Sequence, residues 1–176
     1  CSRDELLRVA SPVQAISFAA ELLLCEGVHL YYSSPSDINY FGYLDSYGAQ
    51  LHPLPSDPEG VVVDSLLAEG NPKNDKVLFI WSSCNPPTNV SLSKGRRDKI
   101  LSVCKTHNIP VIDNCMLELY NLEKDGPNYL FRQGFSDGVV QIGAFPRGMA
   151  AGTWLSWIVA PKSVILRLED IKEKRF

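Results

Sequence analysis

This chain of 176 residues has no apolar run long enough to span a membrane, and it has no excess of basic residues. Its 17 Lys and Arg side chains are outnumbered by 20 Asp and Glu side chains, which gives a net charge of −3 at pH 7. A nucleic-acid-binding domain usually carries a basic surplus. The sequence therefore predicts neither a membrane partner nor nucleic-acid contact by this chain itself.

Metal-binding and disulfide patterns are also missing. The five cysteines form no CxxC pair, and the three histidines lie far apart in the sequence. An odd number of cysteines scattered through apolar segments is typical of reduced thiols in the cytosol. We therefore expect no metal site and a cytoplasmic location.

The chain begins with Cys1 rather than methionine, and no signal peptide precedes its first structured segment. Hydrophobic residues make up 45% of the chain and charged residues 21%, which are ordinary values for a folded domain. A chain of this length can bury a substantial core. We interpret residues 1–176 as one domain of a longer protein.

Predicted strands and helices alternate along the chain, which is typical of an α/β fold with a mostly parallel sheet. Short apolar runs predict strands at 6–10, 28–32, 49–54, 77–81, 109–113, 139–142 and 155–160. Helices are predicted at 12–27, 36–47, 61–68, 91–107 and after Pro161, with Ser11 and Ser93 as N-caps. We expect Pro53 and Pro55 to end the third strand.

Ligands of such sheets bind at the carboxyl ends of the strands. Several polar or special residues follow predicted strand ends, namely Ser11, Ser34, Cys84, Asp113 and Pro146. The sequence therefore places a candidate site at this edge of the sheet.

The segment from Gly143 to Gly152 lies between the last two predicted strands and reads Gly-Ala-Phe-Pro-Arg-Gly-Met-Ala-Ala-Gly. It resembles the segment that carries the Schiff-base lysine of class I/II aminotransferases, the fold-type-I enzymes that use pyridoxal phosphate. Their pattern is Gly-x-Phe-Ser-Lys, followed by small residues and Gly-x-Arg. Arg147 stands at the lysine position. A guanidinium stays protonated and is a poor nucleophile, so Arg147 cannot form the imine with the cofactor.

The resemblance covers nearly the whole chain and is closest to the aminotransferase-like domains of GntR-type transcription regulators, the MocR group. Its further cues are Gly48-Ala49, Pro87-Thr88, Arg96-Arg97 and Ala160-Pro161. It implies the large domain of that family, a three-layer α/β/α fold with a mostly parallel seven-stranded sheet and an antiparallel strand at 155–160. It also implies that the small domain and any N-terminal DNA-binding domain lie outside this chain.

The resemblance assigns four residues to a degenerate cofactor pocket: Ser11 at the phosphate loop, Asn85 before Pro-Pro-Thr, Asp113 opposite the pyridine nitrogen, and Arg147. The phosphate loop is weakened by Pro12, which has no N–H to donate. A ring-contacting aromatic residue of the family is replaced by Asp37, whose charge would repel an anionic ligand.

Three more cofactor positions are altered. Met116 replaces the tyrosine that contacts the phenolic oxygen, and Pro146 replaces the phosphate-binding serine before the lysine. Trp154 replaces a phosphate-binding arginine. The resemblance therefore implies a fold whose family cofactor is pyridoxal phosphate, in a chain that we expect to bind none covalently. Weak, non-covalent binding of a small anion near Ser11, Asn85 and Arg147 stays open.

Three functions remain open. The first is a degenerate, non-catalytic domain that acts as a regulatory, effector or scaffolding module. The second is an active pyridoxal-phosphate-dependent aminotransferase, which requires a lysine elsewhere; Lys94 and Lys162 begin helices but lie in no motif. The third is a pseudoenzyme subunit that pairs with an active homologue. Because sites of this family form at dimer interfaces, we expect a homodimer or a heterodimer, with apolar surface exposed along 163–176.

Overall fold

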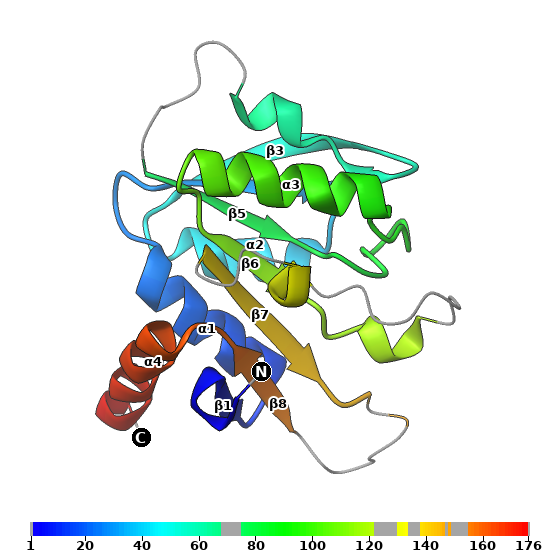
Figure 1. The fold of residues 1–176 in the computed structure, drawn as a ribbon. Helices are drawn as coiled ribbons and strands as arrows, with labels where there is room; N and C mark the ends of the chain where they lie inside the picture. The colour runs from blue at the N-terminus through cyan, green and yellow to red at the C-terminus, as the bar shows by residue number, and fades with distance from the viewer. Residues whose placement is uncertain are drawn as a thin grey trace.

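The computed structural model describes residues 2–67, 75–121, 130–133, 138–146, 148 and 155–175. In these ranges the strands form one eight-stranded sheet, in the order β1-β8-β7-β6-β5-β2-β3-β4 (Figure 1). The strands are β1 (Leu6–Val9), β2 (His29–Ser34), β3 (Gln50–Asp57), β4 (Gly60–Val61), β5 (Lys76–Ile80), β6 (Val111–Asn114), β7 (Val139–Ala144) and β8 (Ser156–Val159).

The sheet is mixed, with a parallel centre. The pairs β2–β3, β2–β5, β5–β6 and β6–β7 are parallel, whereas β8 runs antiparallel to both β7 and β1. The prediction of a mostly parallel sheet with an antiparallel strand at 155–160 is confirmed. The prediction of seven strands is wrong because the chain turns back after β3, and the two-residue strand β4 pairs antiparallel with it.

Helices cover both faces of the sheet, so the predicted three layers are present (Figure 1). The helices are α1 (Pro12–Leu23), α2 (Phe41–Asp45), α3 (Lys94–Thr106) and α4 (Lys162–Arg175), with 3-10 turns η1 (Arg3–Glu5), η2 (Ile38–Tyr40), η3 (Val63–Leu67), η4 (Glu118–Tyr120) and η5 (Leu130–Gln133). The first core cluster joins α1, α2 and α4 to one sheet face, here called the α1 face. The second joins α3, η3 and η5 to the other, here called the α3 face.

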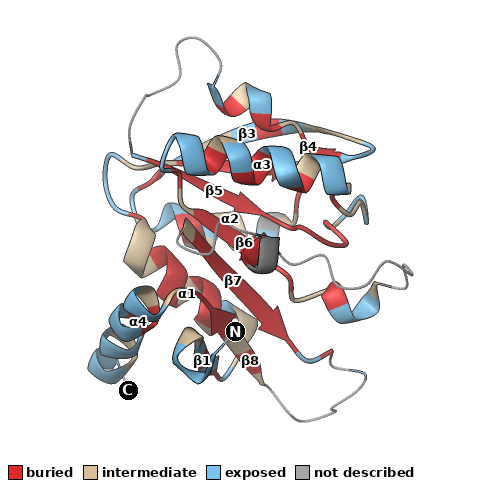
Figure 2. Cartoon of the chain, viewed as in Figure 1, coloured by how far each residue is buried: buried red, intermediate tan, exposed pale blue. Residues whose placement is uncertain are grey.

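Alternation along the strands assigns each side chain to one of these faces. In β5, Phe79 packs in the α1-face core, and its neighbours Leu78 and Ile80 pack in the α3-face core. All five residues of β5 and all six of β7 are buried, so these central strands are covered on both sides (Figure 2). Strands buried on both faces explain why the sequence shows continuous apolar runs rather than alternation.

Strand β3 continues through Pro53 and Pro55, against the prediction that these residues end it. Both prolines have partners in β2, Tyr32 and Ser34. The carbonyl of Pro55 points away from β2 and accepts a hydrogen bond from the Val62 N–H at 2.8 Å. The nitrogens of both prolines therefore face the outer side of the strand, where a missing N–H removes no bond to β2.

The predicted helix at 36–47 is shorter than expected. The carboxylate of Asp37 accepts hydrogen bonds from the backbone and side-chain N–H groups of Asn39, so the segment opens as a turn. Only Phe41–Asp45 is α-helical. The predicted N-caps are confirmed, since Ser11 accepts from the Gln14 N–H and Ser93 from the Arg96 N–H.

Candidate functional site

The carboxyl ends of β2, β5, β6 and β7 meet at one edge of the sheet, and α1 begins at the same edge directly after β1 (Figure 1). This is the edge at which the sequence places the candidate site. Its described residues contain no group of three potential metal ligands, and no described helix of the chain is long and apolar enough to cross a membrane.

The first turn of α1 uses its donors within the chain. The Ser11 hydroxyl accepts from the Gln14 N–H at 3.2 Å, and the Gln14 side chain accepts from the Ala10 N–H at 2.7 Å. Pro12 has no N–H. A helix N-terminus binds an anion through its free N–H groups. This one therefore offers an anion fewer donors than usual.

Asp113 lies fully buried near the end of β6. Its Oδ1 accepts a hydrogen bond from the Ser82 N–H at 3.1 Å. Burial raises the pKa of the Asp113 carboxyl to about 6, although bonds from Cys115, Ser82 and the Leu130 N–H favour the charged form. Leu130 belongs to the α3-face core.

The side chain of Asp113 therefore faces the α3 layer. Strand alternation agrees, because Val111 packs in the α3-face core and Ile112 in the α1-face core. Ser11 begins the helix on the opposite face. The structure consequently does not bring Ser11 and Asp113 together on one face of the sheet.

Asn114 is the polar residue of β6 that does lie on the α1 face. It is fully buried, and its Oδ1 accepts from the Met116 N–H at 3.3 Å. Its Nδ2 has no hydrogen-bond partner among the described residues. The same is true of Trp81 Nε1 and Ser156 Oγ, which share this face. Sequence reasoning missed Asn114, although its position two residues after Ile112 was a signal for it.

Hydrogen bonds from the Asn85 side chain join the segment 33–36 to the loop that contains Thr88. Asn85 Oδ1 accepts from the hydroxyls of Ser33 and Ser36 at 3.3 and 3.4 Å. Its Nδ2 donates to the Pro35 carbonyl at 3.0 Å and to Thr88 Oγ1 at 3.4 Å. Both hydrogens of the amide are thus engaged, so Asn85 has no further donor to offer a ligand in this arrangement.

The remaining predicted positions divide between described and undescribed residues. Met116 accepts a hydrogen bond from the Tyr40 hydroxyl at 3.3 Å, which brings a phenol from η2 beside it. Pro146 is buried, two residues after the end of β7. Arg147 and Trp154 lie outside the described residues.

No protein-family model matches this chain. Among curated proteins it is similar to the uncharacterized HTH-type transcriptional regulator YdfD of Bacillus subtilis, with 28% identity over 171 residues, 97% of this chain and 36% of the regulator. It is also similar to the 2-aminoadipate transaminase of Thermus thermophilus, with 23% identity over 176 residues, 97% of this chain and 44% of the enzyme. The chain thus spans less than half the length of these relatives.

Solved structures decide the fold. A kynurenine aminotransferase of Pyrococcus horikoshii superposes with a TM-score of 0.85 at 19% identity, over 99% of this chain and 45% of its own. An aspartate aminotransferase double mutant of Thermus thermophilus gives 0.86 at 16% identity, over 99% and 46%. The chain has the fold of the large domain of fold-type-I aminotransferases. The resemblance seen in the sequence is therefore confirmed at the level of the fold.

The cofactor of this aminotransferase fold is pyridoxal phosphate, and the described residues do not fit it. A phosphate would find fewer donors than usual at the first turn of α1, because Pro12 has no N–H and the Gln14 N–H is already bonded. Asn114, the polar residue of β6 on the α1 face, has an amide that carries no charge to balance a protonated pyridine ring. We therefore derive no catalytic step through this group.

Proposed function

We propose that this chain is the aminotransferase-like domain of a transcription regulator, and that it acts as a regulatory or scaffolding module without catalysing transamination. The proposal rests on the residues that stand at the cofactor positions assigned by the sequence resemblance, several of which differ from the family pattern. In the described residues these are Pro12, Met116 and Pro146, and in the sequence Arg147 and Trp154 join them. A single change could be compensated, whereas the tether, the phosphate donors and the phenol partner are altered together.

The similarities to curated proteins support the regulatory part. Two HTH-type transcriptional regulators of Bacillus subtilis, YdfD and YisV, match 97% of this chain at 28% and 27% identity. A 2-aminoadipate transaminase and an aromatic-amino-acid aminotransferase match a comparable share of the chain at 23% and 22% identity. A domain retained for regulation needs the fold and a ligand-responsive surface, but no imine chemistry. A cytoplasmic location belongs to this proposal.

An active aminotransferase is the second candidate, favoured by the similarity to the 2-aminoadipate transaminase. It requires a lysine that can replace Arg147 in forming the imine. Lys162 is engaged with the carboxylate of Asp4 at 2.9 Å. Lys94 is exposed at the start of α3, on the face opposite α1. Neither lysine is supported as a replacement, so we rank this candidate second.

The reading frame around this domain tests the regulatory proposal. We expect a winged-helix DNA-binding segment to be encoded upstream of Cys1 in the same open reading frame, and the whole protein to shift a DNA fragment from its own promoter region. The isolated domain is the matched control and should not shift it. A complete upstream frame without such a segment would favour the pseudoenzyme subunit instead.

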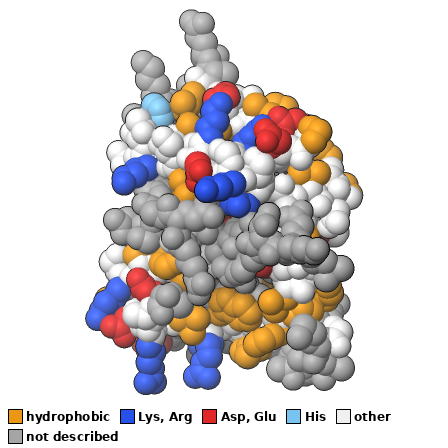
Figure 3. All heavy atoms as spheres, turned by 45° about the vertical axis from the view of Figure 1, so that its right-hand side comes forward, with side chains coloured by type: hydrophobic (Ala, Val, Ile, Leu, Met, Phe, Trp, Pro, Cys, Tyr) orange, Lys and Arg blue, Asp and Glu red, His pale blue; other side chains and the backbone are white. Residues whose placement is uncertain are grey.

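The proposed assembly is a homodimer or a heterodimer. Leu166 in α4 is 56% exposed and Phe145 is 44% exposed, which leaves apolar surface for a partner. Figure 3 shows hydrophobic side chains gathered in the lower half of the face it presents. Sedimentation velocity at high protein concentration should show a dimer, and a monomer alone would contradict this part of the proposal.

A further inference from the structure

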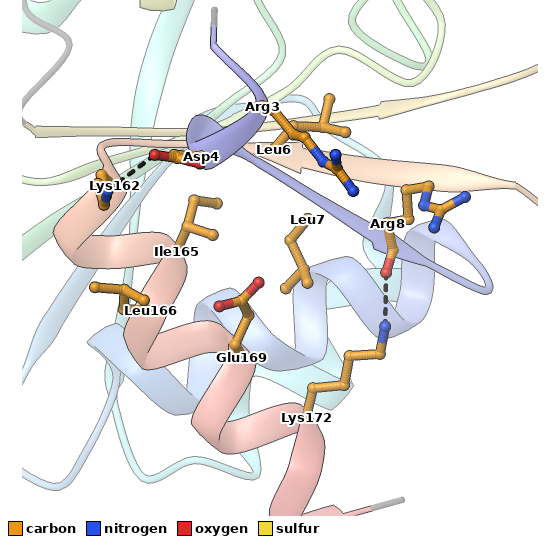
Figure 4. A pocket seen from close by; sticks show the side chains of 10 residues that line it. All are labelled: Arg3, Asp4, Leu6, Leu7, Arg8, Lys162, Ile165, Leu166, Glu169 and Lys172. Carbon is orange, nitrogen blue, oxygen red and sulfur yellow. Dashed lines mark hydrogen bonds and ion pairs between the residues drawn. The ribbon is translucent and has the colours of Figure 1, made fainter.

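A groove of about 670 Å³ lies between the η1–β1 segment and α4. Two contacts bridge it: Lys162 Nζ lies 2.9 Å from the Asp4 carboxylate, and Lys172 Nζ donates to the Arg8 carbonyl at 3.0 Å (Figure 4). The side chain of Arg8 lies on the face of β1 opposite Leu7, which belongs to the core under the groove. The Arg8 guanidinium therefore does not share the apolar floor. Side chains that do converge on one point lie elsewhere, at the amino ends of β2 and β3.

Two histidines meet at those strand ends. His29 begins β2, and His52 lies in β3, 23 residues further along the chain. The two strands pair in parallel, with Tyr31 opposite His52, and the rings of Tyr31 and His52 stack with centroids 4.8 Å apart. His29 lies two residues before Tyr31 and so shares its face of β2, the α3 face. Parallel pairing thus brings together two imidazoles that the sequence spacing keeps apart.

The two rings face each other through one nitrogen each. His29 Nδ1 and His52 Nε2 are 2.8 Å apart, which is a hydrogen bond. One of these nitrogens supplies a lone pair, and a neutral imidazole can carry its hydrogen on its other nitrogen instead. Two neutral rings can therefore present two lone pairs at this separation. Both residues are partly exposed, so solvent reaches the pair.

The separation of the two nitrogens favours one coordination geometry over another. Imidazole nitrogens bind first-row metal ions at about 2.0–2.1 Å. Two such bonds at a right angle place the nitrogens about 2.8–3.0 Å apart, whereas two bonds at a tetrahedral angle place them about 3.3–3.4 Å apart. The 2.8 Å between His29 Nδ1 and His52 Nε2 matches the right angle. Right-angled sites with imidazole ligands suit Ni²⁺ and Cu²⁺.

Lys76 is a charged neighbour of the pair, since it stands opposite His29 on β5. Its Nζ donates to the Leu66 carbonyl at 2.7 Å and lies 5.5 Å from the centroid of the Tyr31 ring. Strand β2 lies between β3 and β5, so His52 and Lys76 approach Tyr31 from opposite sides. The Tyr31 ring therefore stands between the ammonium group and the His52 ring, which limits the repulsion that a bound cation would meet.

We propose that His29 and His52 bind a divalent transition-metal ion of the Ni²⁺ or Cu²⁺ class in two neighbouring, right-angled coordination positions. The rings turn toward the ion, and two coordinate bonds replace their hydrogen bond. Within the described residues no third histidine, cysteine or carboxylate joins the pair, so water completes the coordination. The bound ion joins β2 to β3. This proposal is independent of the proposed regulatory function, because the pair lies at the sheet edge opposite the candidate site.

Calorimetric titration of the purified protein with NiCl₂ tests it. Ni²⁺ is the probe because, unlike Cu²⁺, it does not oxidise free thiols such as that of Cys25. We expect saturable binding of one ion per chain. His29→Ala and His52→Ala should each weaken it by at least about tenfold, because the second bond to an ion already held by the protein forms at high effective concentration. Excess Mg²⁺, which prefers oxygen ligands, should not compete.

His107→Ala is the matched control, since it removes the third histidine, which is exposed at the end of α3 and outside the pair. It should leave the Ni²⁺ affinity unchanged. The wild-type protein gives a readout that needs no variant: paramagnetic Ni²⁺ should broaden the amide resonances around His29 and His52 first. No saturable binding, an equal effect of His107→Ala and His52→Ala, or broadening confined to other residues would each overturn the proposal.

Discussion

Incubation with pyridoxal phosphate is expected to leave this protein without an imine. The sequence resemblance places Arg147 at the position of the lysine that would form it, and a guanidinium does not lose its proton at accessible pH. The absorption spectrum should be the sum of free cofactor and protein. After borohydride reduction, the mass of every lysine-containing peptide should be unchanged.

Non-covalent binding of the cofactor is expected to be weak as well. The α1 N-terminus lacks a donor at Pro12, and its Gln14 N–H is already bonded to Ser11. Each charged hydrogen bond lost costs about 1.5–3 kcal/mol. Since about 1.4 kcal/mol is a factor of ten, two such losses weaken binding by roughly two to four powers of ten. Equilibrium dialysis measures this directly.

The variant Arg147→Lys tests the effect of the missing lysine alone, because it leaves the other altered positions of the pocket unchanged. We expect it to remain without transaminase activity, because the phosphate donors are not restored by a lysine. A pyridoxyl-lysine in the wild-type domain after reduction would contradict the proposed function. Full activity of Arg147→Lys would instead show that the pocket is intact apart from its lysine.

The sequence predicted the fold well where local chemistry and tertiary structure agree. Ser11 and Ser93 cap the helices that follow them, as their local sequence predicts. The mostly apolar run at 139–142 predicts a strand, and the structure places it as the buried strand β7. Pro53 and Pro55 were read wrongly because a proline ends a strand only when its nitrogen faces a partner. Whether the two proline nitrogens face a partner depends on which edge of β3 pairs with β2, and the local sequence does not contain this information.

The candidate site was harder to predict, because it depends on the sheet face to which each side chain points and not only on the position of the residue in the sequence. Asp113 and Asn114 are neighbours in sequence, and resemblance to a family motif singles out the aspartate. In the structure the two side chains point to opposite layers, and only Asn114 lies on the side of α1. A shift of one residue along β6 therefore moves a side chain to the other face of the sheet, and this decides whether it lies on the same side as the first turn of α1.

Asp113 yields the second prediction with a large expected effect. Its pKa rises from 3.8 to about 6 on folding because the carboxyl is buried. Between these two pH values the folded state binds more protons than the unfolded state, so the free energy of unfolding falls as pH rises. A shift of about two units corresponds to about 3 kcal/mol. The cost is absent at low pH and complete above about pH 6.

Replacing Asp113 by Asn removes the titration while keeping an oxygen to accept the Ser82 N–H. We expect the stability difference between Asp113→Asn and wild type, measured by urea denaturation, to move in favour of the variant by about 3 kcal/mol from low to neutral pH. Asp98→Asn, an exposed change on α3, controls for the loss of one charge. Added pyridoxal phosphate should leave this pH dependence unchanged, because Asp113 faces the α3 layer. If the cofactor stabilised the wild type at neutral pH but not the variant, the carboxylate would be meeting a ring nitrogen, and the placement of Asp113 as a buried structural group would be wrong.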